Sequence, residues 1–287
     1  VFAPYDFARQ LVGERGEVTL LLPPGSEAHS YEPTPKDIID IQNCDLFIYV
    51  GGISDAWVAD VLDSVGEGVR TVTLMDCVEL LEEEHVEGME VDEEEHDDGG
   101  VEYDEHVWTS PRNAALICEK IAAALAEADP EGAEHYEAAL VDYTASLDEL
   151  DAAFKEVVAN GARDTIVFAD RFPLLYFARA YGLDYYAAWP GCADEAEPSA
   201  ATVTFLIDKV KEEGIPVVFH IELSNEDMAD IVCDETGAEK RLFSACPTVT
   251  PAQFDAGVTY LELTQQNGHV LREALGGWRS KDARRSP

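Results

Sequence analysis

Two histidines of the 287-residue chain stand in surroundings that suit a metal ligand. His29 lies in the run LLLPPGSEAHSYEPTP, just after a short apolar segment, and His106 lies in YDEHVWTSPRNA, just before a helix signal. Neutral imidazole is the commonest side-chain metal ligand in proteins, and it suits zinc and other late first-row ions. A single loop histidine is most often a plain surface residue, so neither histidine makes a site by itself.

Acidic side chains that could complete such a site follow the expected strands of the second half. Asp170 lies in FADRFP and Glu222 lies in FHIELSN. Ligands of open parallel sheets bind beyond the carboxyl ends of the strands, which is where both residues are placed. His220 shares a strand face with Glu222 by the period of two, and we interpret it as a core or edge residue.

Short apolar runs bounded by Gly and Pro alternate with helix signals in both halves of the chain, and this pattern is typical of parallel sheets. The expected strands are 18–22, 46–50, 72–74, 165–169, 184–188, 217–221 and 241–243. The expected helices are 35–42, 54–62, 110–126, 172–181, 199–213, 226–236 and 251–275. The sequence therefore predicts an α/β fold.

The longest uninterrupted helical pattern runs from Ala133 to Ala159 and contains no Gly or Pro. Its apolar residues recur at spacings of mostly three and four, and at about 1.5 Å per residue it would extend for roughly 40 Å. A helix of that length exceeds one small domain. We predict two Rossmann-like lobes with parallel sheets joined by one long rigid helix, with boundaries at 1–129 for the N-terminal lobe, 130–160 for the linking helix and 161–287 for the C-terminal lobe.

Acidic residues outnumber basic ones by 59 to 19, and the formal charge of −40 excludes several classes of partner. A surface this negative repels phosphate backbones and anionic lipid headgroups, so we expect no nucleic-acid partner and no binding to a membrane surface. The apolar fraction of 46% is ample for a folded core, and no apolar run is long enough to cross a bilayer. The acidity indicates either the composition of a salt-adapted source or a field that concentrates a cation.

The densest acidic stretch, 82–105, holds 14 of the acids and no Lys or Arg. Its removal leaves 45 acids against 19 bases, a charge of −26, so the acidity is not confined to it. The low apolar content predicts a solvated, mobile loop. With His85 and His96 among its carboxylates, the stretch is either a low-affinity cation collector or a charge run without function.

The runs PPGSEAHSYEPTPKDIIDIQNCDLFIYVGG and DEHVWTSPRNA resemble the metal-binding solute receptors of zinc and manganese ABC importers. The long helix and the ending GVTYLELTQQNGHVLREAL are similar to the same family, so the resemblance covers almost the whole chain. It implies two α/β lobes that hold a metal in the cleft between them with residues from both. It also implies an extracytoplasmic protein, either periplasmic or a cell-surface lipoprotein, with a signal region and any lipid-attachment Cys before Val1.

Carried over residue by residue, the resemblance implies the metal ligands. His29 matches the family's first His, in G-S-x-x-H-x-Y-E-P-T, and His106 matches its second, in D-x-H-x-W-x-S-P. The second half departs from the pattern, because FADRFP stands where the family carries S-[HE]-x-A-F. Asp170 is the nearest candidate there, with a salt bridge or a helix cap as its structural alternative, and Arg171 occupies the ligand's column. Glu222 matches a Glu that the family places near the cleft.

The family's fourth ligand, an Asp, has no counterpart in SACPTVT, where Pro247 or Thr248 takes the position. Cys246 lies beside it and is either a thiolate ligand or a buried apolar side chain. Cys192 and Cys246 both follow expected strands at the cleft end, which makes them the one cysteine pair of the chain that could be linked by a disulfide.

The resemblance implies a monomeric receptor that binds a divalent metal and delivers it to an ABC permease, touching the membrane only through that permease or a lipid anchor. Two histidines favour Zn²⁺, with Mn²⁺ possible where oxygen ligands dominate. The chain has no Gly-rich phosphate loop, nucleophile elbow or HExxH motif, so we predict no enzyme activity. Two alternatives stay open, a metal-dependent hydrolase with a His and carboxylate site and an adhesin-like lipoprotein with a decayed metal site.

Overall fold

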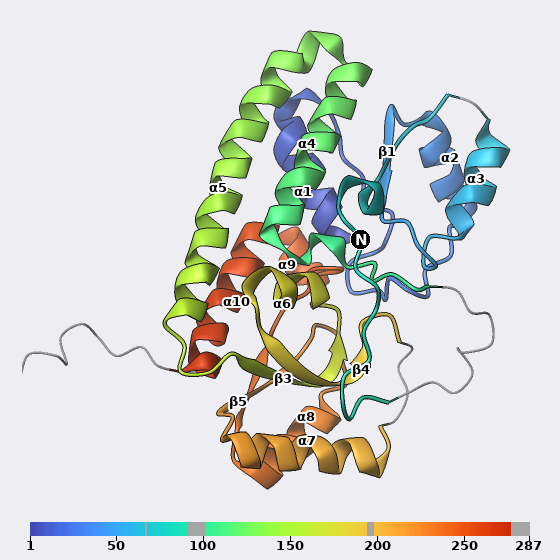
Figure 1. The fold of residues 1–287 in the computed structure, drawn as a ribbon. Coiled ribbons are helices and arrows are strands. Elements are labelled where there is room, and N and C mark those ends of the chain that lie inside the picture. Colours follow the sequence, from blue (N-terminus) through green and yellow to red (C-terminus); the bar gives the residue numbers. More distant parts are fainter. Residues whose placement is uncertain (67, 91–100, 194–197, 277–287) are drawn as a thin grey trace, which may run out of the picture.

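Two parallel sheets and a bank of long helices make up the computed structural model, which describes residues 1–66, 68–90, 101–193 and 198–276 (Figure 1). The first sheet pairs β1 with β2, and the second has the strand order β4-β3-β5-β6, with every pairing parallel. The strands are β1 (Leu46–Tyr49), β2 (Arg70–Thr73), β3 (Thr165–Phe172), β4 (Asp184–Pro190), β5 (Val217–His220) and β6 (Glu239–Leu242).

The helices that alternate with these strands confirm the α/β prediction. In chain order they are α1 (Phe2–Val12), α2 (Pro35–Asn43), α3 (Trp57–Val65), α4 (Pro111–Ala128), α5 (Ala133–Ala159), α6 (Leu175–Tyr181), α7 (Ala200–Glu213), α8 (Asp227–Thr236), α9 (Pro251–Asp255) and α10 (Tyr260–Leu275).

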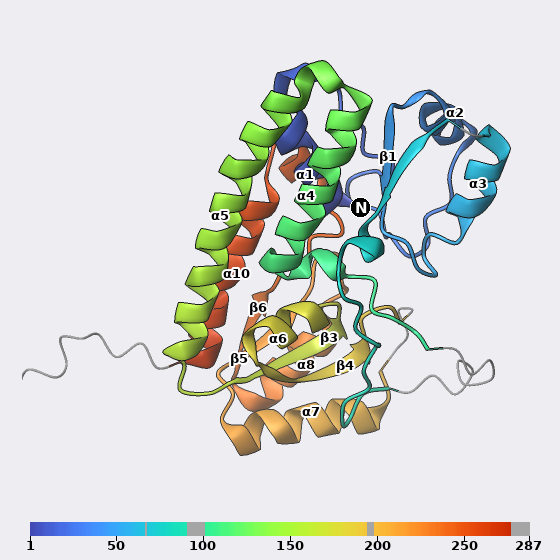
Figure 2. The ribbon, with the colours of Figure 1, turned by 45° about the horizontal axis from the view of Figure 1, so that its top comes forward.

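The long helix α5 begins and ends where the sequence predicted, and it connects two hydrophobic cores. Tyr143 and Leu147 near its middle pack into the core around α1 and α4. Phe154 and Val157 on its second half pack into the core of the four-stranded sheet. Helix α10 lies beside α5 and also reaches both cores (Figure 2). The two halves of the chain are therefore held at a defined separation by a pair of packed helices.

Helices cover both faces of the four-stranded sheet, so its central strands β3 and β5 are largely buried, whereas the edge strand β6 has no buried residue. On β3, Phe168 faces the core shared with α5, α6 and α10, whereas Val167 faces a core formed with α7 and α8. Successive side chains of a strand point to opposite faces, which explains the continuous apolar run that the sequence shows here. The carboxyl ends of β3, β4 and β5 are thereby presented together at one edge.

Two predicted elements differ in the structure. The expected strand at 18–22 is not a strand, because the segment has no strand partner in the described part of the chain; a cavity of about 1130 Å³ is lined both by this segment and by β1. The expected helix at 251–275 is two helices, since Gly257 adopts φ +75° after α9 and Thr259 caps the start of α10 through a capping box. Helix α1 was not predicted.

Replacing Phe154 by Ala should remove a central part of the second core. Phe154 is 1% exposed and packs edge-on against Phe177 at a ring distance of 4.8 Å. We expect the free energy of unfolding to fall by about 3–5 kcal/mol, measured by denaturant titration. Val141→Ala on the same helix is the control, because Val141 is 61% exposed and its loss should change stability by less than about 0.5 kcal/mol. Equal effects of the two substitutions would contradict this account of the core.

Candidate metal centre

His29 and His106 are brought together across a small cavity. Their ring centroids lie 5.4 Å apart, and both rings line a cavity of about 20 Å³. That volume is enough for one water-sized occupant or a single ion. Glu27, Arg171 and Glu222 also line it, so the cavity is bounded by residues from both halves of the chain.

His29 is oriented by a chain of contacts within the N-terminal half. Its Nδ1 lies 2.8 Å from Ser54 Oγ, and the backbone N–H of Ser54 donates to Glu105 Oε1 at 3.1 Å. Glu105 immediately precedes His106, so this chain of contacts links the two histidines through Ser54. The contact with Ser54 fixes the Nδ1 side of the His29 ring, so a metal in the cavity would be bound through Nε2.

His106 is buried and is held by the carboxylate two residues before it. Asp104 Oδ1 accepts the His106 backbone N–H at 2.7 Å and lies 3.1 Å from His106 Nδ1. Burial alone would lower the pKa of His106, but the Asp104 carboxylate outweighs it and raises the pKa above the usual value. A carboxylate on the far nitrogen is the support that metal-binding histidines ordinarily have.

Trp108 fixes the His106 segment to the C-terminal half. It lies in the 3₁₀ turn η4 (Val107–Thr109), its ring stands edge-on to His106 at 5.5 Å, and its Nε1–H donates to the carbonyl of Ala245 at 2.7 Å. Tyr260 at the start of α10 donates its hydroxyl to the Trp108 carbonyl at 2.8 Å. Gly191 packs against the His106 ring, and a side chain at this position would crowd it, since a Cβ there would lie 3.3 Å from His106 Nδ1.

Glu222 lies on the C-terminal side of the cavity, and its carboxylate holds the following loop. Its two oxygens accept the backbone N–H groups of Ala245 at 3.0 Å and Cys246 at 2.7 Å, together with the Ser244 hydroxyl at 3.3 Å. Burial raises the pKa of Glu222 above its usual value. Leu223 and Cys246 have φ near +60°, so strained backbone concentrates beside this carboxylate.

Asp170 is turned away from the cavity. Its Oδ1 accepts the Arg171 backbone N–H at 2.8 Å and its Oδ2 accepts the Ile221 N–H at 3.0 Å, which ties the ends of β3 and β5. The Arg171 side chain lines the cavity instead and pairs with Glu27 Oε2 at 3.3 Å. Sequence reasoning missed Glu27, whose signal was its position two residues before His29.

The cysteines take no part in the cavity. All six lie in the described residues and are free, so Cys192 and Cys246 form no disulfide in this structure. Cys246 is 1% exposed, and burial raises its thiol pKa well above the usual value. This favours a buried neutral thiol over a thiolate ligand.

The described residues contain no group of three or more His, Cys, Asp or Glu side chains close enough to share a metal ion. The imidazoles of His29 and His106 supply the side-chain nitrogen donors that line the cavity. The carboxylates of Glu27 and Glu222 line the same cavity while they are bound to other partners. The donor set fits a late first-row cation, and its oxygen ligands would have to be released from their present contacts.

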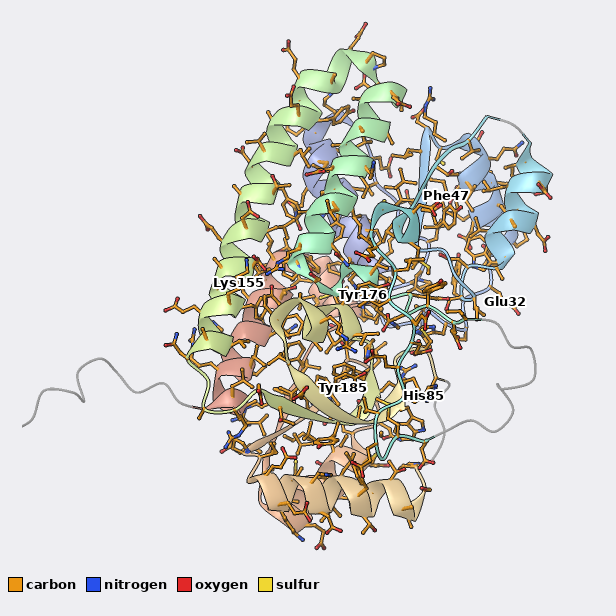
Figure 3. All side chains as sticks on the ribbon, viewed as in Figure 1. Glu32, Phe47, His85, Lys155, Tyr176 and Tyr185 are labelled. Carbon is orange, nitrogen blue, oxygen red and sulfur yellow. The ribbon has the colours of Figure 1, made fainter. Side chains whose placement is uncertain are left out.

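The start of the acidic stretch belongs to a strap, residues 79–90, that crosses onto the C-terminal half. Figure 3 labels two tyrosines that meet it: Tyr176 accepts the Leu81 N–H at 3.1 Å, and Tyr185 donates to Glu84 at 3.5 Å. Met89 is buried in the core of the four-stranded sheet. Arg179 forms an ion pair with Glu84.

The expectation of a solvated, mobile loop is therefore wrong for the described parts of 82–105. The strap forms a β-bridge between Glu82 and Tyr103, and Leu81 accepts the Asp104 N–H at 3.0 Å. Apolar burial of Val86 and Met89 and pairing with basic residues of the C-terminal half offset the charge. Residues 91–100, which include His96, lie outside the described residues.

Residues 1–274 match the model of the family described as the periplasmic component A of the zinc-uptake complex. The chain is 32% identical over 275 residues to the high-affinity zinc uptake system protein ZnuA of Bacillus subtilis, covering 94% of this chain and 84% of that protein. It is 30% identical over 274 residues to the zinc-binding lipoprotein AdcA of Streptococcus pneumoniae. That match covers 94% of this chain but 53% of AdcA, so the chain spans about half the length of that relative.

The fold matches that of a solved relative. The crystal structure of the Zn(II)-bound ZnuA-like domain of Streptococcus pneumoniae AdcA superimposes with a TM-score of 0.78 at 29% identity, covering 96% of each chain. Among the described residues of the present chain, no helix is both long enough and apolar enough to cross a membrane.

The packing of the strap can be tested through Glu83, whose carboxylate should make the stability of the protein depend on pH. Its carboxylate accepts the Cys192 N–H at 3.0 Å, and burial raises its pKa from 4.5 to about 7. The folded chain therefore binds more protons than the unfolded chain between these values, and this group lowers stability as the pH rises through that window. Glu83→Gln keeps the acceptor without the charge, so it should stabilise the protein by about 1–3 kcal/mol at pH 8.

The gain should disappear near pH 4.5, measured by thermal or denaturant unfolding at both pH values. Glu87→Gln is the control, because Glu87 lies on the same strap but is 75% exposed, 3.8 Å from Lys209. A Glu83→Gln gain that is the same at both pH values would contradict the buried, charged state assigned to this carboxylate.

Proposed function

Since the chain belongs to the family of the periplasmic component A of zinc-uptake complexes, we propose that it binds one zinc ion between His29 and His106. Family membership confirms the resemblance carried by the two histidine motifs. The protein is the zinc-binding receptor of an ABC uptake system, and it is a solute-binding protein rather than an enzyme.

The meeting of His29 and His106 on one ion-sized cavity carries the proposal. The Nδ1 atom of each ring is held, by Ser54 in His29 and by Asp104 in His106, and these contacts orient both rings on the cavity. Zinc takes imidazole nitrogens with tetrahedral geometry and has no redox chemistry, so this pair favours zinc over manganese.

Carboxylate donors complete the proposed set from the opposite side of the cavity. Glu222 is the first of them, because it already lines the cavity, although its oxygens bind the Ala245 and Cys246 amides in this structure. Asp170 would have to leave two backbone amides to reach the metal, so we place it as a support of the β3 and β5 ends. Closing the site with protein ligands suits a receptor, because catalytic zinc keeps an open position.

Delivery and location follow from the same family. We propose that the loaded receptor docks on the permease of its uptake system and releases zinc there. An extracytoplasmic location, either periplasmic or lipid-anchored, matches the description of the family and of the lipoprotein relative. We expect a monomer, since residues of both halves of one chain line the cavity.

Removal of either histidine should abolish tight zinc binding. In calorimetric titration of chelator-treated protein, we expect about one zinc per chain, bound more tightly than manganese, and an affinity at least about 100-fold lower in His29→Ala or His106→Ala. His135→Ala is the control, because His135 lies on α5, bonds to the Val12 carbonyl at 3.0 Å and does not line the cavity. If the variant that carries both His29→Ala and His106→Ala bound zinc as tightly as the wild type, the proposed site would be refuted.

A further inference from the structure

A cation of the protein itself occupies the rim of the proposed zinc cavity. The Arg171 guanidinium comes from the end of β3 in the C-terminal half, and its Nη2 lies 3.3 Å from Glu27 Oε2 in the N-terminal half. Its Nη1 lies 3.4 Å from the Ala193 carbonyl. The Arg171 side chain is 8% exposed and the Glu27 side chain 40%, so the pair lies at the opening of the cavity and spans the two halves.

Glu27 is placed as a metal ligand would be, but its oxygens are engaged. It precedes His29 by two residues on the same loop and lines the same cavity. Its Oε1 accepts the N–H groups of Ala28 at 3.1 Å and His29 at 3.4 Å, which holds the carboxylate next to the histidine.

The neighbouring carboxylate does not take over the role of Glu27. Asp170 precedes Arg171 in the chain, yet both of its oxygens bind backbone N–H groups. Glu27 is the carboxylate with which Arg171 forms an ion pair among the described residues. A zinc ion entering the cavity therefore meets a fixed positive charge and a carboxylate already paired with it. Repulsion between two cations is strong in a site from which water is largely excluded.

Resting on the proposed zinc function, we propose that Glu27 is a latent zinc ligand and that Arg171 competes with zinc for its carboxylate. Arg171 thereby limits zinc affinity and provides a counter-cation that takes Glu27 back when the metal leaves. This assigns to the Glu27–Arg171 pair the release step that a delivering receptor requires.

The test compares zinc affinities of variants by competition with a chelator of known affinity. Arg171→Gln should bind zinc about 10-fold more tightly or better, with slower dissociation, because Glu27 is released and the repulsion is removed. The double variant Arg171→Gln with Glu27→Gln should lose that gain. Arg241→Gln is the control: it removes one positive charge at β6, where Arg241 pairs with Glu273 at 2.9 Å, and should leave affinity unchanged.

A spectroscopic measurement distinguishes binding of the metal by Glu27 from a loss of repulsion between Arg171 and the metal. The visible absorption of Co²⁺ bound in place of zinc responds to the ligand set, so it should change between wild type and Arg171→Gln and revert in the double variant. Arg171→Met, which fills the same space without charge, replaces Arg171→Gln if circular dichroism shows that the glutamine variant does not fold.

Two results would overturn the inference while leaving the zinc receptor intact: an Arg171→Gln variant no tighter than wild type, or a gain that persists in full in the double variant. The second result would make Arg171 a source of repulsion alone. Failure of the wild type to bind zinc would instead refute the proposed function, so the two failures are distinguishable.

Discussion

The site depends on burial of the segment from Asp104 to Ser110 between the two halves of the molecule. All seven of its residues are at most 5% exposed, although it contains two carboxylates and a histidine. Charged groups removed from water must find partners within the protein. The Asp104 carboxylate contacts the His106 ring, and Glu105 accepts the Ser54 N–H. These contacts offset the free-energy cost of burying the charged groups, and they also orient both histidines.

On the opposite wall of the cavity, the carboxylate of Glu222 is likewise held by hydrogen bonds within the protein. Glu222 is half-buried and binds two backbone amides of the loop that also receives the Trp108 indole at Ala245. Leu223 and Cys246 keep positive φ angles within this arrangement, which costs free energy that the surrounding hydrogen bonds offset. The strain lies beside the cavity rather than in the helices, where α5 and α10 form regular packing.

The regular elements could be predicted from the sequence because their signals are local. The bounds of α5 followed from a helical pattern free of Gly and Pro, and β3 and β5 followed from short apolar runs. The strand expected at 18–22 was wrong because pairing depends on a distant neighbour, which an apolar run does not reveal. The histidines were found through motifs, whereas Glu27 and Arg171 are 144 residues apart in sequence, so only the fold shows that they meet.

An electrostatic field from the acidic surface would act on a different step from the buried arginine. Surface carboxylates attract a cation over distances that salt limits to about 10 Å at 0.1 M, so they affect the rate of encounter more than the strength of binding. The strap shows that part of the acidic stretch is packed against the C-terminal half, where Arg179 and Lys209 balance it. Arg171 is buried at the cavity itself and is screened far less. A cation that approaches the protein is therefore attracted by a surface of net charge −40. At the proposed binding site it meets the positive charge of Arg171.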